Sequence, residues 1–448
     1  VFSLFLRANF GLSGDTAGLI YGVFLALVYF LPLVGGIMAD KFGYGKMVTI
    51  GIIVMFAGYL FLSIPLGGGV MGYAAMFGAL LLVSLGTGLF KGNLQVMVGN
   101  LYDAPELSAK RDSGFSIFYM AINIGALFAP TAAVRIKEWA EHSLGYSGND
   151  AYHFSFAVAC VSLIVSMMIY YAFRSTFKHV EAGAGKSKKT DTAGTEEELT
   201  PQQTKERIVA LCLVFAVVIF FWMSFHQNGL TLTFFADEFV SPKSEGVQTM
   251  AFDVINLVMI IFMIYSLMSF FQSKTSKAKL ISTVVFLAAV GVLVYKYHNI
   301  GGPVDVSAPI FQQFNPFYVV ALTPVSMAIF GALAAKGKEP TAPRKIAYGM
   351  IIAGSAYLLM VLASRGLLTP NEQAAAKAAG ETVPFASGNW LIGTYLILTF
   401  GELLLSPMGI SFVSKVAPPK YKGAMMGGWF VATAIGNLLV SVGGYLWG

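Results

Sequence analysis

The stretch SLGTGLFKGNLQVMVG, residues 84–99, has the composition of a membrane-spanning helix that carries a single charge. Lys91 is the only charged residue between Met47 and Tyr102. An ammonium group near the centre of a bilayer costs several kcal/mol, so such a lysine points to a partner of opposite charge or to a water-filled cavity. The stretch therefore predicts a polar feature inside a membrane protein.

The composition of the whole chain agrees with a membrane protein. Of its 448 residues, 56% are hydrophobic and only 12% are charged, against about 25% charged in an ordinary soluble domain. A soluble fold of this size needs a more polar surface, and a membrane β-barrel would alternate in segments of about ten residues. The sequence predicts an all-α polytopic membrane protein. Its two cysteines, Cys160 and Cys212, are too isolated to indicate a disulfide framework or a metal site.

Apolar runs of about 20 residues mark the expected spans. An opening fragment at 1–8 begins in the middle of a helix-like run, which suggests that the sequence lacks its true beginning. Twelve spans are predicted after it, at 15–39, 47–65, 71–100, 114–134, 151–173, 206–236, 248–271, 280–297, 316–335, 346–363, 389–412 and 424–447.

The basic residues are distributed unequally between the two sets of loops. One set holds 21 Lys and Arg, the other holds seven, and Lys91 accounts for the last of the 29. Loops rich in Lys and Arg lie on the cytoplasmic side. The net charge of +6 is thereby explained without a nucleic-acid partner.

A polar linker divides the spans into two sets. The sequence predicts an N-terminal bundle at 1–173, a cytoplasmic linker at 174–205 and the first helix of the C-terminal bundle at 206–247. An inserted peripheral helix pair follows at 248–297, and the remainder of the C-terminal bundle at 298–448. Thr200-Pro201 and Thr369-Pro370 are expected to begin helices, the second a short surface helix that stops at Gly380. Two bundles joined by a basic linker are typical of a transporter.

Two full charges lie well inside the predicted spans, Lys91 in the first half of the chain and Glu402 in the second. Buried opposite charges are normally paired or face a cavity, so a pair across the two halves could hold one side of a cavity closed. Two alternatives remain open. Lys91 could extend its amine to the headgroups, and Glu402 could be a structural carboxylate near the backbone that Pro407 leaves unpaired.

Other polar and aromatic side chains in the spans are weaker candidates. His226 could carry protons, or be a neutral imidazole bonded to a neighbouring helix. Asn123 and Asn315 could serve a site or bond across helices. Tyr29, Trp222 and Trp429 could line a cavity, although aromatic residues in spans more often pack or anchor at the interface.

The segment GGIMADKFGYGK, residues 35–46, resembles the loop signature of the major facilitator superfamily. The matching positions are Gly36, Asp40, Lys41, Gly43 and Lys46. Small residues allow helices to approach closely, Asp40 is able to cap a neighbouring helix, and the bases stay in the cytoplasm.

A narrower resemblance runs in order along nearly the whole chain. The segments that carry it are FKGNLQVMVGNLY, RDSGFSIFYMAINIGALFAP, FNPFYVVALTPV and GELLLSPMGISFVSKVAPPKYKGAMMGGWF. They resemble the proton-dependent oligopeptide transporter family, a branch of the major facilitator superfamily. The helix pair at 248–297 is similar to an insertion of its bacterial members, so the expected fold is two six-helix bundles plus this pair.

The resemblance implies a proton symporter of di- and tripeptides in the bacterial inner membrane. Lys91 and Glu402 would close the cytoplasmic side, and Glu402 would also hold the peptide's amino terminus. Asn123, Asn315 and Tyr29 would contact the peptide, and its side-chain pockets would be shaped by Trp222, Ser406 and Trp429. The expected functional unit is a monomer, with protons as coupling ion and no cofactor, metal or nucleic acid.

Two departures from the family pattern affect the expected mechanism. The Glu-x-x-Glu-Arg motif of the family's first helix and its twelfth core helix are absent, so the chain is interpreted as part of a longer protein. His226 stands where many members have a glutamate that closes the external side, and a histidine could take over the titrating role.

Two other functions compete with peptide symport. One is another transporter of the facilitator class, for a drug or a small anion, on the same fold. The other is a membrane-embedded enzyme, which would need paired ligands or an activated nucleophile. The spans contain no such cluster in the sequence, so an enzyme is not predicted.

Overall fold

The computed structural model describes residues 5–6, 9–12, 14–183, 199–306, 308–440, 442–443 and 446. Most of the predicted opening fragment and residues 184–198 of the predicted linker lie outside the described residues. The chain divides into two compact units. The first unit comprises Val1–Phe115, Phe128–Ile219 and Ile410–Gly436, and the second comprises Ser116–Leu127, Phe220–Gly409 and Asn437–Gly448.

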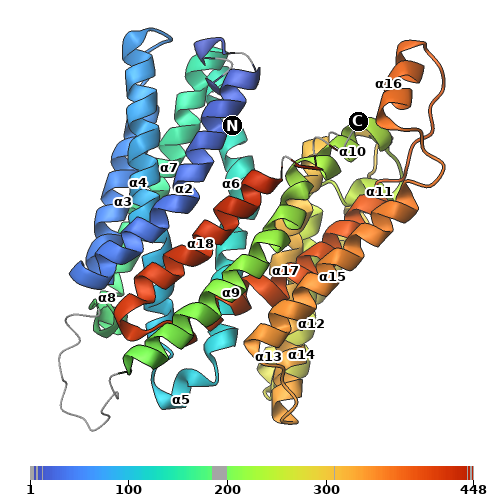
Figure 1. The fold of residues 1–448 in the computed structure, drawn as a ribbon. Helices are drawn as coiled ribbons and strands as arrows, with labels where there is room; N and C mark the ends of the chain where they lie inside the picture. The colour runs from blue at the N-terminus through green and yellow to red at the C-terminus, as the bar shows by residue number, and fades with distance from the viewer. Residues whose placement is uncertain are drawn as a thin grey trace. The chain divides into compact units, whose positions relative to one another are not determined.

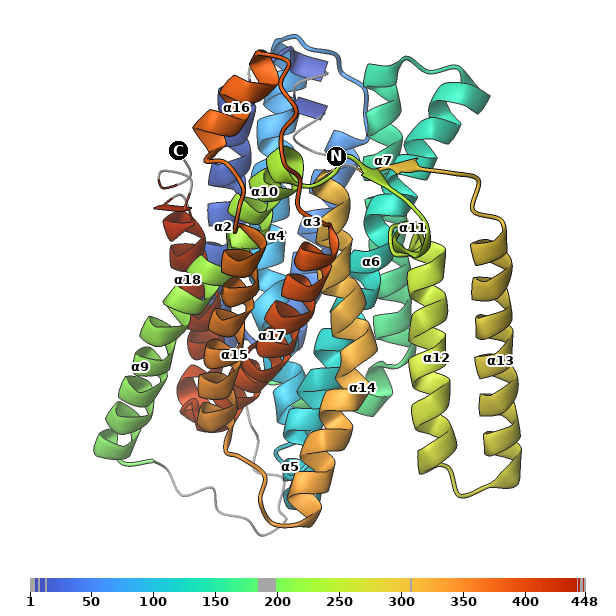
Figure 2. The ribbon, with the colours of Figure 1, turned by 90° about the vertical axis from the view of Figure 1, so that its right-hand side faces the viewer.

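The described residues are overwhelmingly helical (Figures 1 and 2). The long helices are α2 (Gly14–Phe42), α3 (Tyr44–Leu62), α4 (Val70–Asn100), α6 (Arg111–Leu144), α7 (Gly148–Ala172), α9 (Pro201–Phe225), α12 (Val254–Gln272), α13 (Ser276–His298), α14 (Phe314–Ala335), α15 (Ala342–Ala363), α17 (Asn389–Val416) and α18 (Lys422–Leu439). Short helices are α5 (Pro105–Ser108), α8 (Arg174–Phe177), α10 (Thr231–Phe239), α11 (Val247–Met250) and α16 (Pro370–Ala378). The 3₁₀ turns are η1 (Lys178–Val180), η2 (His226–Gly229), η3 (Ala308–Gln313) and η4 (Pro419–Tyr421). Strands β1 (Lys243–Ser244) and β2 (Val304–Asp305) pair antiparallel, with Lys243 opposite Asp305.

Eleven helical segments of the described chain are long and apolar enough to cross a membrane. They confirm eleven of the twelve predicted spans with shifted ends. The remaining prediction, 424–447, corresponds to the 18-residue, glycine-rich helix α18, and part of it lies outside the described residues.

Local sequence rules account for several helix ends. The Thr369 side chain accepts a hydrogen bond from the Glu372 amide, and the Glu372 carboxylate accepts one from the Thr369 amide, which is a capping box. The backbone of Gly380 has φ 74°, a left-handed conformation that favours glycine after a helix. Pro201 likewise begins α9, with the Thr200 hydroxyl accepting from the Gln203 amide at 3.2 Å. Both predicted helix starts are confirmed.

The predicted span 206–236 is not one continuous α-helix. Helix α9 ends at Phe225, a 3₁₀ turn follows at His226–Gly229, and α10 resumes at Thr231. The turn has the sequence HQNG, whose His, Asn and Gly favour α-helix poorly. Tyr395 fastens the turn by donating its hydroxyl to the Asn228 carbonyl at 3.1 Å.

Candidate functional site

Helix α2 of the first unit ends in the loop signature, and the Asp40 carboxylate of this signature caps another helix. Asp40 accepts hydrogen bonds from the amides of Gly423 and Ala424, at 2.8 and 3.0 Å, and from the Tyr44 hydroxyl at 2.7 Å. These amides lie in the first turn of α18, where backbone N–H groups have no partner within their own helix. A carboxylate there also faces the positive end of the helix dipole. The expectation that Asp40 caps a neighbouring helix is confirmed.

Glycines allow α2 and α18 to approach this closely. A Cβ on Gly36 would lie 2.0 Å from the Gly423 carbonyl oxygen. Gly43, between α2 and α3, has φ 103°, which a residue with a side chain rarely adopts. Lys41 and Lys46, the bases of the signature, are exposed.

The segment after α7 is fastened to the same loop. The Glu181 carbonyl accepts from the Gly45 amide at 3.2 Å. The Glu181 carboxylate accepts from Arg174, 2.8 Å from Nη2, and from the Tyr170 hydroxyl at 3.0 Å. Burial raises the pKa of Glu181, but the hydrogen bonds from Arg174 and Tyr170 outweigh it and hold the pKa below its ordinary value of 4.5.

This arrangement predicts that the segment is released in acid. Because the pKa of Glu181 is lower in the folded state, its stabilising effect is present above pH 4.5 and is lost as the pH falls through the lowered pKa. We expect limited proteolysis across 178–183 to be several-fold faster at about pH 3 than at about pH 6. Glu181→Gln should be cleaved at the fast rate at both pH values. Equal resistance of the wild-type segment at the two pH values would contradict the prediction.

A second polar network of the first unit joins residues near the start of α6 to the C-terminal helices. Arg111 donates to Asp103 and to the Ser414 hydroxyl, both at 2.7 Å. Lys422 pairs with the other oxygen of Asp103 at 2.9 Å, and Ser411 donates to Asp112 at 2.6 Å. The sequence interpretation assigned no role to these residues, because nothing local indicates that positions so far apart in the chain are in contact.

Lys91 lies on α4 among aromatic rings. Its amine is 4.2 Å from the centre of the Tyr29 ring and 4.9 Å from the centre of the Phe430 ring. An ammonium over an aromatic face is stabilised by the ring quadrupole, by about 1 kcal/mol. The structure therefore brings together two of the predicted site residues, Lys91 and Tyr29. Trp429 is buried and packs edge-on against Phe215.

Glu402 is the centre of a cluster in the second unit. Its side chain is 3% exposed. One carboxylate oxygen accepts from the Tyr119 hydroxyl, and the other accepts from the Asn315 amide at 2.6 Å. Asn123 donates to the Tyr119 carbonyl at 2.9 Å. We call Glu402, Tyr119, Asn315 and Asn123 the carboxylate cluster.

The carboxylate cluster contains three predicted site residues and one that sequence reasoning missed. Tyr119 lies four residues before Asn123, so both point to one face of α6. The four-residue spacing indicates that Tyr119 could share a site with Asn123. A tyrosine in an apolar helix is common, however, so the sequence alone does not mark Tyr119 as a site residue. Asn315 bonds across helices, as the alternative interpretation expected, and its partner is the buried carboxylate itself.

Three further predicted residues also belong to the second unit. Trp222 and His226 stack, with ring centres 5.2 Å apart and planes 22° apart. Ser406 is 1% exposed, and its hydroxyl has no hydrogen-bond partner within the described part of the chain. Lys91 belongs to the first unit, so its pairing with Glu402 stays a prediction.

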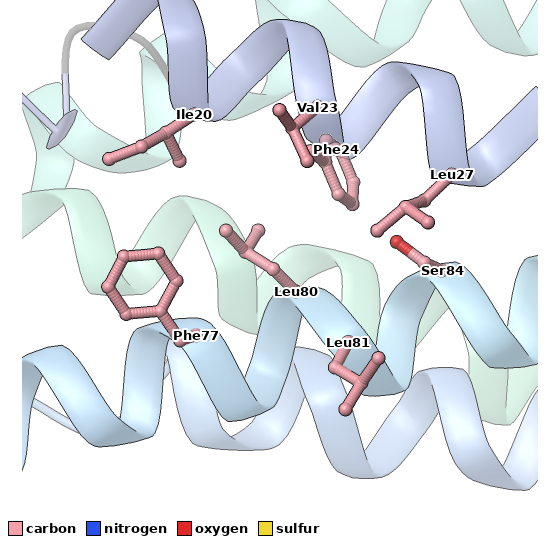
Figure 3. A pocket seen from close by; sticks show the side chains of 8 residues that line it. All are labelled: Ile20, Val23, Phe24, Leu27, Phe77, Leu80, Leu81 and Ser84. Carbon is pink, nitrogen blue, oxygen red and sulfur yellow. The ribbon is translucent and has the colours of Figure 1, made fainter. Parts of the chain in front are cut away.

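A cavity of about 280 Å³ lies between α2 and α4 of the first unit (Figure 3). Its lining is apolar except for Ser84, and comprises Ile20, Val23, Phe24, Leu27, Phe77, Leu80, Leu81 and Ser84. None of the predicted site residues is among those that line this cavity.

Comparison with known proteins identifies relatives in sequence. A family model described as the POT family matches residues 45–194 and 296–444. The peptide transporter YePEPT of Yersinia enterocolitica is 26% identical over 455 residues, which cover 97% of this chain and 80% of the relative. A di-/tripeptide transporter of Lactococcus lactis subsp. cremoris is 28% identical over 450 residues, covering 95% and 79%.

Solved structures agree with the fold. A bacterial homologue of the human drug peptide transporters aligns with a TM-score of 0.57 at 18% identity, over 97% of this chain and 84% of that one. This likeness confirms the predicted all-α polytopic fold. Since the family model matches more than half of the 448 residues, the chain belongs to the POT family, the proton-dependent oligopeptide transporters.

Proposed function

We propose that the protein imports di- and tripeptides together with protons by alternating access. The observation that carries this proposal is the carboxylate cluster, in which a buried glutamate accepts hydrogen bonds from two neutral donors, Tyr119 and Asn315. Such a carboxylate accepts either a proton or the ammonium group of a peptide. Membership of the family and the names of the relatives support the same substrate.

Peptide recognition follows from the chemistry of these side chains. Glu402 would take the amino terminus, and the amides of Asn123 and Asn315 would bond the peptide backbone and its termini. Tyr29 would help to hold the peptide, and Lys91 supplies a positive charge of the kind that its carboxylate requires. Hydrogen bonds to the backbone do not depend on side-chain identity, so one site would accept many peptides.

The pockets for the side chains of the peptide would be shaped by three residues whose own side chains are largely apolar or small. We assign this role to Trp222, Ser406 and Trp429. The buried indole nitrogen of Trp222 and the hydroxyl of Ser406 have no hydrogen-bond partner among the described residues. Buried polar atoms without partners are rare, and a ligand's polar groups would satisfy them.

Proton coupling would act through Glu402. When a proton or a peptide amine neutralises Glu402, its pairing with Lys91 weakens and the cytoplasmic side opens. The proton thereby biases a two-state equilibrium, which requires different affinities for the two states. An inward potential contributes about 2.3 kcal/mol per charge per 100 mV. His226 is a further candidate for the titrating group on the external side.

The closing contacts would lie on the cytoplasmic side. The positive-inside rule places the loop of Gly36, Asp40, Lys41, Gly43 and Lys46 in the cytoplasm, with the linker at 174–205 on the same side. We place the protein in the bacterial inner membrane with a monomer as the functional unit. The bundles at 1–173 and 206–448, the latter with the inserted pair at 248–297, would rock against each other.

The test is uptake of labelled dialanine by liposomes that contain the full-length protein. We expect an imposed inward proton gradient to drive accumulation, and unlabelled tripeptide to compete with it. Liposomes with an uncoupler should only equilibrate. If the wild type takes up no dialanine while it transports a drug or a small anion, the peptide assignment is wrong and the facilitator alternative holds.

A further inference from the structure

The helix pair α12 and α13 forms a hairpin in the second unit (Figure 2). The two helices are tied by the Ser282–Ser269 hydrogen bond at 3.0 Å and by an ion pair of Lys296 with Asp253. Helix α13 carries many exposed apolar side chains, whereas α12 packs against α14. The hairpin therefore contacts α14 through α12.

One side chain of α12 makes a specific polar contact with α14. The Tyr265 hydroxyl donates to the Val320 carbonyl at 2.9 Å. Pro324 lies inside α14 and has no N–H, so the carbonyl four residues before it loses its donor within the helix. That carbonyl is the one on Val320. The hairpin thus supplies the hydrogen bond that the proline removes, in a segment where an unpaired carbonyl is costly.

The same hydroxyl also reaches the helix that carries Tyr119. The Tyr265 oxygen lies 2.6 Å from the Met120 sulfur on α6. Met120 directly follows Tyr119, and Asn315 is in the first turn of α14. The two residues that donate to the Glu402 carboxylate therefore lie on the two helices that Tyr265 touches.

We propose that the α12–α13 hairpin is a brace for the carboxylate cluster, and that Tyr265 is its positioning residue. Tyr265 does not touch Glu402 in this role. It fixes α14 at the Val320 carbonyl and α6 at Met120, and thereby fixes the spacing of the Asn315 and Tyr119 donors. The kinetic part of this inference rests on the proposed peptide transport, and the structural part does not.

The structural part is tested by hydrogen exchange on the purified wild type, Tyr265→Phe and Tyr295→Phe. Tyr265→Phe removes only the hydroxyl, and we expect amide exchange in α14 around Val320 and Pro324 to accelerate by about threefold or more. Tyr295 is 70% exposed on α13 and is the matched control, which should exchange like the wild type. Unchanged exchange in α14 of Tyr265→Phe would overturn the brace.

The kinetic part is tested by dialanine counterflow in liposomes. We expect Tyr265→Phe to raise KM by about fivefold, the effect of one hydrogen bond, with less than about twofold change in the maximum rate. In an Asn315→Ala background the same substitution should change KM little, because the two residues act in series. Faster exchange in α14 with unchanged KM, or a full effect in the Asn315→Ala background, would overturn the positioning role. Absence of any dialanine counterflow in the wild type would instead refute the proposed function, while the exchange result still decides on the brace.

Discussion

Glu402→Gln and Lys91→Ala are each expected to reduce gradient-driven accumulation of dialanine by about tenfold or more. Hydrogen bonds to charged groups contribute about 1.5–3 kcal/mol, which corresponds to one or two powers of ten. Glutamine at 402 keeps the shape of the side chain but neither takes up a proton nor neutralises an ammonium. Alanine at 91 removes the amine that lies against Tyr29 and Phe430. The measurement is the ratio of internal to external dialanine at steady state.

Peptide exchange without a gradient separates coupling from binding. Exchange should persist in Lys91→Ala if the lysine serves coupling, and weaken in Glu402→Gln if the carboxylate also binds the amino terminus. Lys338→Ala and Glu245→Gln remove exposed charges and are the matched controls. Fully proton-driven uptake by Glu402→Gln would require the coupling mechanism proposed for this residue to be abandoned.

The parts of the fold that follow local rules could be predicted from the sequence. The capping of α16 by Thr369 and the start of α9 at Pro201 depend on residues within one turn, and both were found. The break in the helix at His226 also has a local cause, the sequence HQNG. It was not predicted because these residues lie inside an apolar run that is long enough for a single span. Asp40 was predicted correctly because the spacing of the loop signature implies what its carboxylate contacts.

The residues that were missed depend on contacts between distant parts of the chain. Tyr119 and Glu402 are 283 positions apart, and Tyr265 lies 145 positions from Met120. In the sequence, Tyr119 and Tyr265 are ordinary tyrosines of apolar helices. Only the packing places Tyr119 beside a carboxylate and Tyr265 beside a carbonyl that has no donor within its own helix. Lys91 and Glu402 could be singled out because a charged residue in a membrane span is rare, whereas a tyrosine in a span is common.

Gly36→Ala is expected to lower the free energy of unfolding by about 3 kcal/mol and to reduce uptake by about tenfold or more. The added Cβ would lie 2.0 Å from the Gly423 carbonyl oxygen and 2.4 Å from its carbon. Both are backbone atoms, so no flexible side chain can move aside. To relieve the overlap α18 must shift away from α2, and the Asp40 carboxylate then loses the amides of Gly423 and Ala424. The helix start would be left with unpaired N–H groups, which adds to the cost.

Thermal unfolding and dialanine uptake should be measured on the same preparation. Gly22→Ala is the matched control, because it lies on the same helix and a Cβ there meets nothing within 4 Å. We expect that control to unfold and transport like the wild type. Asp40→Asn keeps an oxygen that accepts but loses the charge at the helix start, so its loss should be smaller than that of Gly36→Ala. If Gly36→Ala transported at the wild-type rate with an unchanged melting temperature, the close contact of α2 with α18 would not be needed at any step of the cycle.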